Sequence, residues 1–140
     1  MSRVILYKHP DGTVGMIRSF SQTTSLEDFA ANRFTADDEY KFVNIVDLPA
    51  ITFFDAWMYG PTITIDLDKA KDVAHHHRRI ARNTEMKQYD DIIAKQIPGE
   101  TEAAEAERVK IRAKYTTKQT EIDACTDIDS LQAIIDEMRS

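Results

Sequence analysis

The stretch RVILYKHPDGTVGMIRSF, residues 3–20, decides how the chain begins to fold. Two runs rich in β-branched and aromatic residues flank the sequence HPDG. Pro10 fixes its own φ, and the following Asp11 and Gly12 favour a reversal of the chain. The pattern predicts a β-hairpin in which residues 3–9 pair with residues 13–20.

The segments that follow predict a short helix and two more strands. In TTSLEDFAANRF, Thr24 or Ser25 is placed to cap a helix. Its buried face is expected to hold Leu26, Phe29, Ala30 and Phe34. Alternation of apolar and polar residues predicts a strand over residues 40–48, and TITIDL predicts another over residues 62–67.

From Lys69 onward the composition changes to Ala, Glu, Lys, Arg and Gln, and only IPGE at 97–100 interrupts it. Asp66 or Asp68 is placed to cap the first helix, and Thr126 and Asp129 have capping-box spacing before the last one. Helices are predicted over residues 69–96, 101–124 and 129–138. A regular stripe on the second helix is expected to pack: Ala104, Arg108, Ile111, Tyr115, Lys118, Ile122 and Cys125.

Together these elements predict the α+β class. Residues 1–68 are expected to form a small β-rich domain: a hairpin, a short helix and two further strands. Residues 69–140 are expected to form a helical hairpin with a short terminal helix. The apolar stripes on this hairpin are thin and interrupted by charge, so we expect further subunits or the β-rich part to complete their burial.

Composition excludes several classes. A chain of 140 residues can bury a hydrophobic core without disulfides or a bound metal, and its single cysteine, Cys125, rules out an internal disulfide framework. No apolar run is long enough to cross a bilayer, so we expect no membrane insertion. The net charge of −6 disfavours a general nucleic-acid binder. No catalytic or cofactor motif stands out, so we expect neither an enzyme nor a cofactor.

DVAHHHRRIARN, residues 72–83, raises the question of a metal site. On a helix, successive residues point about 100° apart, so the three adjacent imidazoles diverge and cannot share one ion. We therefore expect no metal.

The same segment offers a protein interface. His77 and Ile80 fall at helical spacing on one stripe with Val73 and Thr84, and that stripe is expected to pack on protein. Arg78 and Arg79 make the segment locally basic and are further interface candidates. A nucleic-acid contact through Arg78, Arg79 and Arg82 is the alternative, but no nucleic-acid-binding motif accompanies them.

Four aromatic residues crowd ITFFDAWMY, residues 51–59. Trp57 is expected to plug the sheet, whereas Phe54 and Tyr59 are expected to lean toward solvent or a partner. Exposed aromatic side chains are frequent interface anchors.

The order VILYKHPDGTVGMI, EYKFVNIVDLPAITFFDAW, ITIDLDKAKDVAHHHRRIARN and TDIDSLQAI resembles small proteins encoded among the tail genes of long-tailed bacteriophages. The resemblance covers nearly the whole chain, and its motifs are short and mostly structural. Many such proteins have Arg where this chain has Phe54, which argues against a polar role at that position.

The resemblance implies a structural protein of the phage tail, located in the virion and assembled in the host cytoplasm. A tail-tip or collar protein is preferred, forming a homo-oligomeric ring that contacts other tail proteins and offers an attachment point for fibres. The alternative is a tail assembly chaperone that is not retained in the virion.

Overall fold

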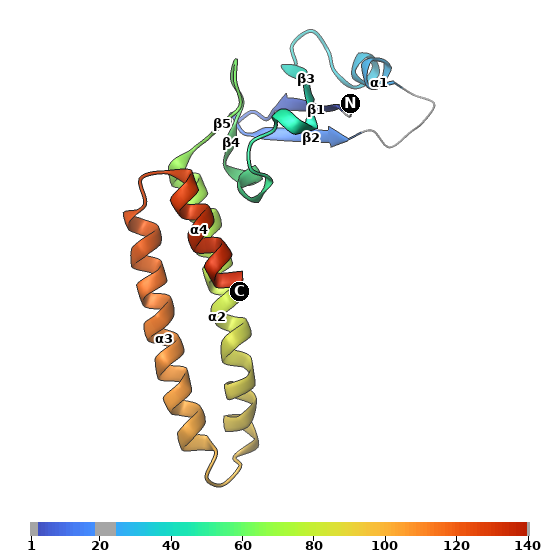
Figure 1. Cartoon of the computed structure of the whole chain (residues 1–140). Helices are drawn as coiled ribbons and strands as arrows, with labels where there is room; N and C mark the ends of the chain where they lie inside the picture. Colours follow the sequence, from blue (N-terminus) through green and yellow to red (C-terminus); the bar gives the residue numbers. More distant parts are fainter. Residues whose placement is uncertain (1–2, 19–24, 140) are drawn as a thin grey trace. The chain divides into compact units, whose positions relative to one another are not determined.

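The computed structural model describes residues 3–18 and 25–139 of the chain. A small antiparallel sheet is followed by long helices (Figure 1), which confirms the predicted α+β class. The chain divides into two compact units, Met1–Lys69 and Ala70–Ser140, which are described separately below.

The predicted hairpin is confirmed. β1 (Arg3–Lys8) pairs with β2 (Val14–Arg18), and β3 (Tyr40–Asn44) pairs with the other side of β1, so the strand order is β2-β1-β3. The turn is closed by hydrogen bonds from His9 N to Thr13 O and from Gly12 N to His9 O, both 2.9 Å. Gly12 has φ 89°, a left-handed conformation that glycine adopts readily. The predicted end of the hairpin, Ser19 and Phe20, lies outside the described residues.

One face of the sheet carries the core of the first unit. Val4 and Leu6 of β1 and Val14 of β2 are buried together with Trp57, which is fully covered. The Trp57 indole donates to Ala50 O at 3.2 Å, so its polar atom has a partner in the core. The prediction that Trp57 plugs the sheet is confirmed.

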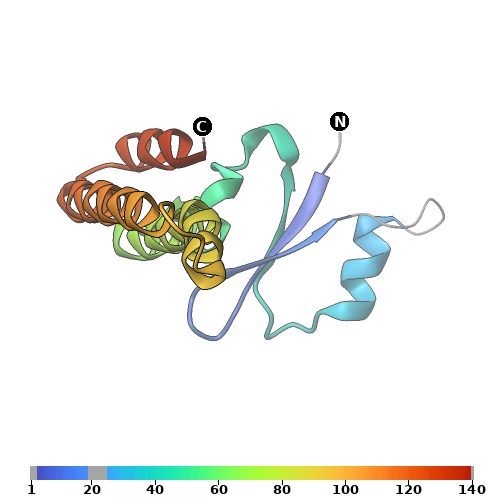
Figure 2. The ribbon, with the colours of Figure 1, turned by 90° about the horizontal axis from the view of Figure 1, so that it is seen from below.

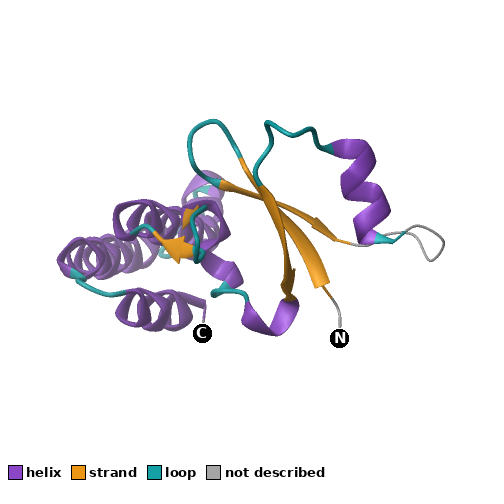
Figure 3. Cartoon of the chain, turned by 90° about the horizontal axis from the view of Figure 1, so that it is seen from above, coloured by secondary structure: helices purple, strands orange, loops and turns teal. Residues whose placement is uncertain are grey.

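The opposite face is covered by α1 (Leu26–Arg33), which borders the strands in Figures 2 and 3. Ser25 is its N-cap and accepts from Asp28 N at 3.1 Å, one of the two caps predicted; Thr24 lies outside the described residues. Of the predicted helix face, Ala30 is buried, and Leu26, Phe29 and Phe34 are half-buried. Phe34 stacks on Tyr40 with ring centroids 4.6 Å apart.

The prediction of one strand over residues 40–48 is wrong at its end. β3 ends at Asn44, which pairs with Arg3 of β1, and the chain then leaves the extended conformation. Residues Ile45–Asp47 instead form a 3₁₀ turn, and a second 3₁₀ segment covers Ile51–Ala56.

The prediction of a strand over residues 62–67 is also too long. β5 is only Thr64–Ile65, because its partner β4 (Trp57–Met58) offers two residues for pairing. Asp66 leaves this small sheet and accepts from Lys69 N at 2.9 Å, so it caps the next helix. Asp66, and not Asp68, is therefore the cap.

The second unit is helical. α2 (Leu67–Lys95) and α3 (Thr101–Ala124) form an antiparallel hairpin, and α4 (Ile128–Arg139) folds back beside it (Figure 1). The bounds of α3 equal the prediction, and those of α2 and α4 differ from it by one or two residues. The turn between α2 and α3 has φ 52° at Gln96 and φ 81° at Gly99.

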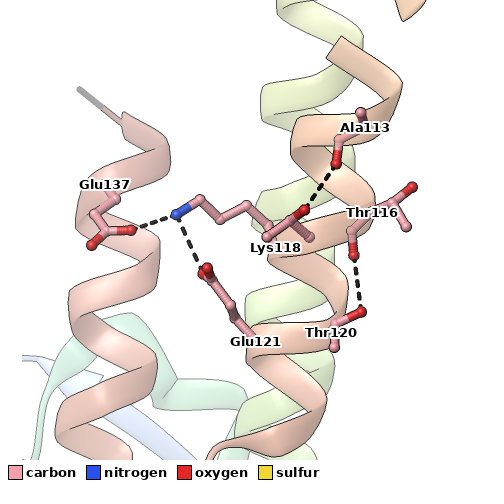
Figure 4. Close-up of polar contacts among 7 residues, drawn as sticks. Ala113, Thr116, Lys118, Thr120, Glu121 and Glu137 are labelled. Atoms are coloured by element: carbon pink, nitrogen blue, oxygen red, sulfur yellow. Dashed lines mark hydrogen bonds and ion pairs between the residues drawn. The ribbon is translucent and has the colours of Figure 1, made fainter. Parts of the chain in front are cut away.

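The predicted stripe on α3 is confirmed as the seam of this unit. Ala104, Ile111, Tyr115, Ile122 and Cys125 are buried. α4 adds Leu131, Ile135 and Met138 to the buried set. Figure 4 shows Lys118 of α3, which bonds Glu137 of α4 and, at 3.3 Å, Glu121 of its own helix.

The capping prediction for α4 is wrong by one residue. Asp127, and not Thr126, caps the helix, because its carboxylate accepts from Ser130 N at 2.7 Å. The predicted box failed because three capping residues, Thr126, Asp127 and Asp129, lie within four positions.

Candidate interaction surfaces

The two aromatic interface candidates of the first unit are less exposed than predicted. Phe54 and Tyr59 are both partly buried and pack on the core of the sheet. The Phe54 ring meets Trp57 edge to face, with centroids 4.9 Å apart. The expectation that both rings turn away from the core is therefore wrong for Phe54. Tyr59 keeps one accessible side, which faces a recess.

This recess, called the tyrosine recess below, is a cavity of about 510 Å³ at the beginning of β3. It is lined by Lys8, Asp38, Glu39, Tyr40, Lys41, Tyr59, Gly60 and Pro61. Two segments about twenty residues apart in the sequence meet here, because Lys41 Nζ donates to Gly60 O and, at 3.2 Å, to Pro61 O. The sequence offered no signal for this meeting, since it depends on one side chain reaching two carbonyls.

The lysines of the tyrosine recess already have partners. Lys41 Nζ lies 4.7 Å from the centroid of the Tyr59 ring, a cation–π distance, and Lys8 pairs with Glu39 at 3.5 Å. Burial, and then the negative charge of Glu39, raises the pKa of the Tyr59 hydroxyl. The hydroxyl therefore stays neutral at physiological pH and can donate a hydrogen bond.

On α2, the three arginines Arg78, Arg79 and Arg82 form a basic surface, called the arginine patch below. Arg79 is exposed, and Arg78 and Arg82 are half-buried. No described residue forms an ion pair or a hydrogen bond with the side chain of Arg79 or Arg82. Burial, and then the charge of Arg79, lowers the pKa of the Arg78 guanidinium. The patch is thus an accumulation of like charges.

His75 joins this patch to α3, a role that the sequence did not suggest. Its side chain is only 14% exposed. Arg78 Nε donates to His75 Nδ1 at 3.2 Å, so the ring proton lies on Nε2, which donates to Asp123 Oδ1 at 2.8 Å. Lys71 Nζ also donates to the backbone oxygen of Asp123, at 3.0 Å. The spacing of Lys71, His75 and Arg78, which are one turn apart in succession, was the available signal.

The other candidates on α2, His77 and Ile80, lie beside a second cavity, called the α4 groove below. It has a volume of about 370 Å³ and is lined by His77, Ile80, Ala81, Thr84, Glu85, Tyr115, Met138 and Arg139. Burial, and then the charge of Arg139, lowers the pKa of His77, which favours the neutral ring. The predicted packing stripe is only partly correct, because Ile80 is 51% exposed and Thr84 is exposed as well. Ala70 and Ala74 are buried in its place.

One exposed apolar surface was not predicted from the sequence. Ile45, Val46 and Ile51 are 44%, 74% and 56% exposed, all within seven positions of the two 3₁₀ segments. We call these residues the aliphatic ridge. Ile45 and Val46 were predicted to lie in a strand, and their exposure follows from the end of β3 at Asn44.

The described residues contain no group of three or more His, Cys, Asp or Glu placed to hold a metal ion. Within the same residues, no helix combines the length and the apolar character needed to cross a membrane. Cys125 is buried, and burial raises the pKa of its thiol, which makes it a poor nucleophile.

Comparison with known proteins adds no relative: no protein-family model, no curated protein and no solved structure matches this chain.

Proposed function

We propose that this chain is a structural component of a bacteriophage tail, a tail-tip or collar ring protein that offers an attachment point for fibres. It acts through protein–protein contacts. The resemblance to tail-gene proteins described above supports the class. The residues that carry that resemblance include DLPAITFFDAW, residues 47–57, which bears part of the aliphatic ridge.

The aliphatic ridge is the observation that carries the proposal. Val46 exposes 74% of its surface, and Ile45 and Ile51 expose about half of theirs. Exposing three large aliphatic side chains within seven positions of the sequence is unfavourable in water, at roughly 25 cal/mol per Å² of apolar surface left uncovered. A partner that covers the ridge would remove this surface from water.

The test is the protein composition of purified particles of a phage that encodes this chain. Mass spectrometry is expected to detect the chain in particles at several copies per tail. A chain made during infection but absent from particles would reject the proposal. If that chain also bound another tail protein in infected cells, the assembly chaperone would take its place.

The aliphatic ridge can be tested in the same phage. Replacing Val46 with Asp is expected to leave the fold intact, since the side chain is exposed, but to reduce the amount of the chain in particles by about tenfold or more. Val109→Asp is the matched control, because Val109 is 54% exposed on α3 and lies outside the ridge. If both variants were incorporated into particles equally well, the ridge would have no role in incorporation.

A further inference from the structure

The arginine patch carries more positive charge than its surroundings neutralise. Asp123 is the one carboxylate that acts on Arg78, and it already accepts from His75. Arg78 and Arg82 are four positions apart, and Arg79 and Arg82 three, so like charges repel along one side of the helix.

Most other cations of the same unit have a carboxylate partner; among its described residues, Lys95 and Arg139 are further cations without an ion pair. Lys87 pairs with Asp91, Arg108 with Asp90 and Glu105, and Lys114 with Glu85. Lys118 pairs with two glutamates. What sets the arginines of the patch apart is their number: three lie within five positions of one helix, in a chain whose net charge is −6.

The first unit provides the complementary chemistry. Residues 37–39 are Asp-Asp-Glu, the one run of three consecutive acids in the sequence. Two of them, Asp38 and Glu39, line the tyrosine recess beside Tyr40 and Tyr59. A guanidinium is planar, so it can stack on a tyrosine ring while it bonds a carboxylate. The recess thus combines the two groups that recognise arginine. Lys8 pairs with Glu39 there and Lys41 lies over the Tyr59 ring, so an incoming guanidinium would take the place of these lysines.

We propose that the arginine patch of one copy of this chain docks in the tyrosine recess of a second copy. The contact joins two different surfaces, so it is heterologous, and repeating it from copy to copy builds a ring where the rotation closes. This inference rests on the ring form of the proposed function and names the surfaces that would join its subunits.

A nucleic acid fits the patch less well than a second copy does. Arg78 and Arg82 are four residues apart, about 6 Å along the helix axis, which spans only one or two phosphates. Nucleic-acid binding typically rests on roughly 6–10 phosphate contacts, and here the remainder of a polyanion would meet a chain of net charge −6. The exposed side chain of Ile80, next to Arg79, adds apolar contact that a protein partner can use.

Charge reversal on the full-length chain tests the contact. One variant carries Arg79→Glu and Arg82→Glu; the other carries Asp37→Lys and Glu39→Lys and spares Asp38, whose carboxylate accepts from Thr35 N at 2.8 Å. In sedimentation experiments at about 0.05 M salt, the unaltered chain is expected to self-associate, and to dissociate at about 1 M salt. Each variant alone is expected to self-associate about 100-fold or more weakly.

The decisive measurement is a mixture of the two variants. Each variant then presents the charge that the other lacks, so the mixture is expected to form alternating assemblies although neither variant does so alone. Matched controls make the same change in net charge outside both surfaces: Lys87→Glu with Lys95→Glu, and Asp47→Lys with Asp55→Lys. Both controls are expected to self-associate like the unaltered chain, within about threefold.

Three results would overturn the proposal: an unaltered chain that is monomeric at low salt, variants that associate normally, or a mixture that stays dissociated. The same variants are titrated with a labelled single-stranded oligonucleotide of about 20 nucleotides. Binding that depends on Arg79 and Arg82, without self-association, would assign the patch to nucleic acid. Particle composition is measured separately, so a chain found in particles without this contact leaves the proposed function standing.

Discussion

Position 15 accommodates only glycine, because the ring of Tyr7 occupies the space that a side chain would need. A Cβ placed on Gly15 would lie 2.2 Å from Cζ of Tyr7, far inside contact distance. The ring has little room to move away, because His9 and Phe34 pack on it with centroids at 5.1 and 5.5 Å. The cross-strand pair of Gly15 and Tyr7 therefore fixes the face that α1 covers.

Gly15→Ala is expected to lower the free energy of unfolding by about 1–3 kcal/mol, because the added methyl group overpacks this face. Urea unfolding measures the change. In a Tyr7→Ala background the same substitution should be neutral or slightly stabilising, since alanine suits a strand better than glycine does. A penalty of equal size in both backgrounds would show that Tyr7 is not its cause.

Glu85 makes the stability of the helical unit depend on pH. Burial is the largest single influence and would raise the pKa of Glu85, but the hydrogen bond from Lys114 at 2.8 Å, the neighbouring Tyr115 and the charge of Lys114 together outweigh it and hold the pKa below the ordinary value of 4.5. The Tyr115 hydroxyl lies beside the same carboxylate, yet Tyr115 Oη and Glu85 Oε2 do not reach hydrogen-bond geometry. We therefore attribute the lowered pKa mainly to Lys114.

Because the folded state favours the ionised form, the contribution of Glu85 is complete above pH 4.5 and is lost as the pH falls through the lowered pKa. Glu85→Gln is expected to lower the free energy of unfolding at pH 7 by at most about 1 kcal/mol, because both side chains are more than a third exposed. Urea unfolding at a series of pH values should show the difference vanish in acid. With Lys114→Met present, the loss caused by Glu85→Gln at pH 7 should disappear or change sign, because burial by itself raises the pKa of Glu85.

At the scale of elements, α4 depends on its first residues. Asp127→Ala is expected to cost about 1 kcal/mol, because the Ser130 N–H loses its acceptor. Asp129→Ala is the matched control: it removes the same charge from the same turn but no capping bond, so a smaller loss is expected. Thermal unfolding of both variants compares their stabilities. A larger loss of stability from Asp129→Ala than from Asp127→Ala would contradict the assignment of Asp127 as the cap.

The helices were predictable because their signals are local. The stripe on α3 repeats every three or four residues over about six turns, and the glycine at 99 marks the break before it. The ends of β3 and β5 were not predictable, because the alternation that predicted these strands runs on past the paired residues. The chain leaves the extended conformation after Asn44, and β4 has two residues, and neither limit is written in the strand itself.

Of the interaction surfaces, too, only those built from neighbouring residues of one helix could be predicted from the sequence. Arg78 and Arg79 could be found from the sequence, because their charges are adjacent on one helix. The tyrosine recess could not, since its lining comes from segments about twenty residues apart, which Lys41 connects through the Gly60 and Pro61 carbonyls. The aliphatic ridge was hidden by its composition, which is that of a buried strand.

For the whole molecule, charge is distributed unevenly. The net charge of −6 suggests a uniformly acidic surface, but the arginine patch lies on one unit and the acidic run at residues 37–39 on the other. A chain with such separated charges presents different surfaces to different neighbours, which suits a protein repeated around a ring.

The buried indole of Trp57 gives the chain a built-in optical reporter. It is the only tryptophan in the sequence and lies in the first unit, with no exposed surface. Most helical residues belong to α3, α4 and the greater part of α2, all in the second unit. Tryptophan fluorescence therefore follows the sheet, and far-ultraviolet circular dichroism follows mainly the helices. The unfolding of each unit can thus be monitored without adding a label.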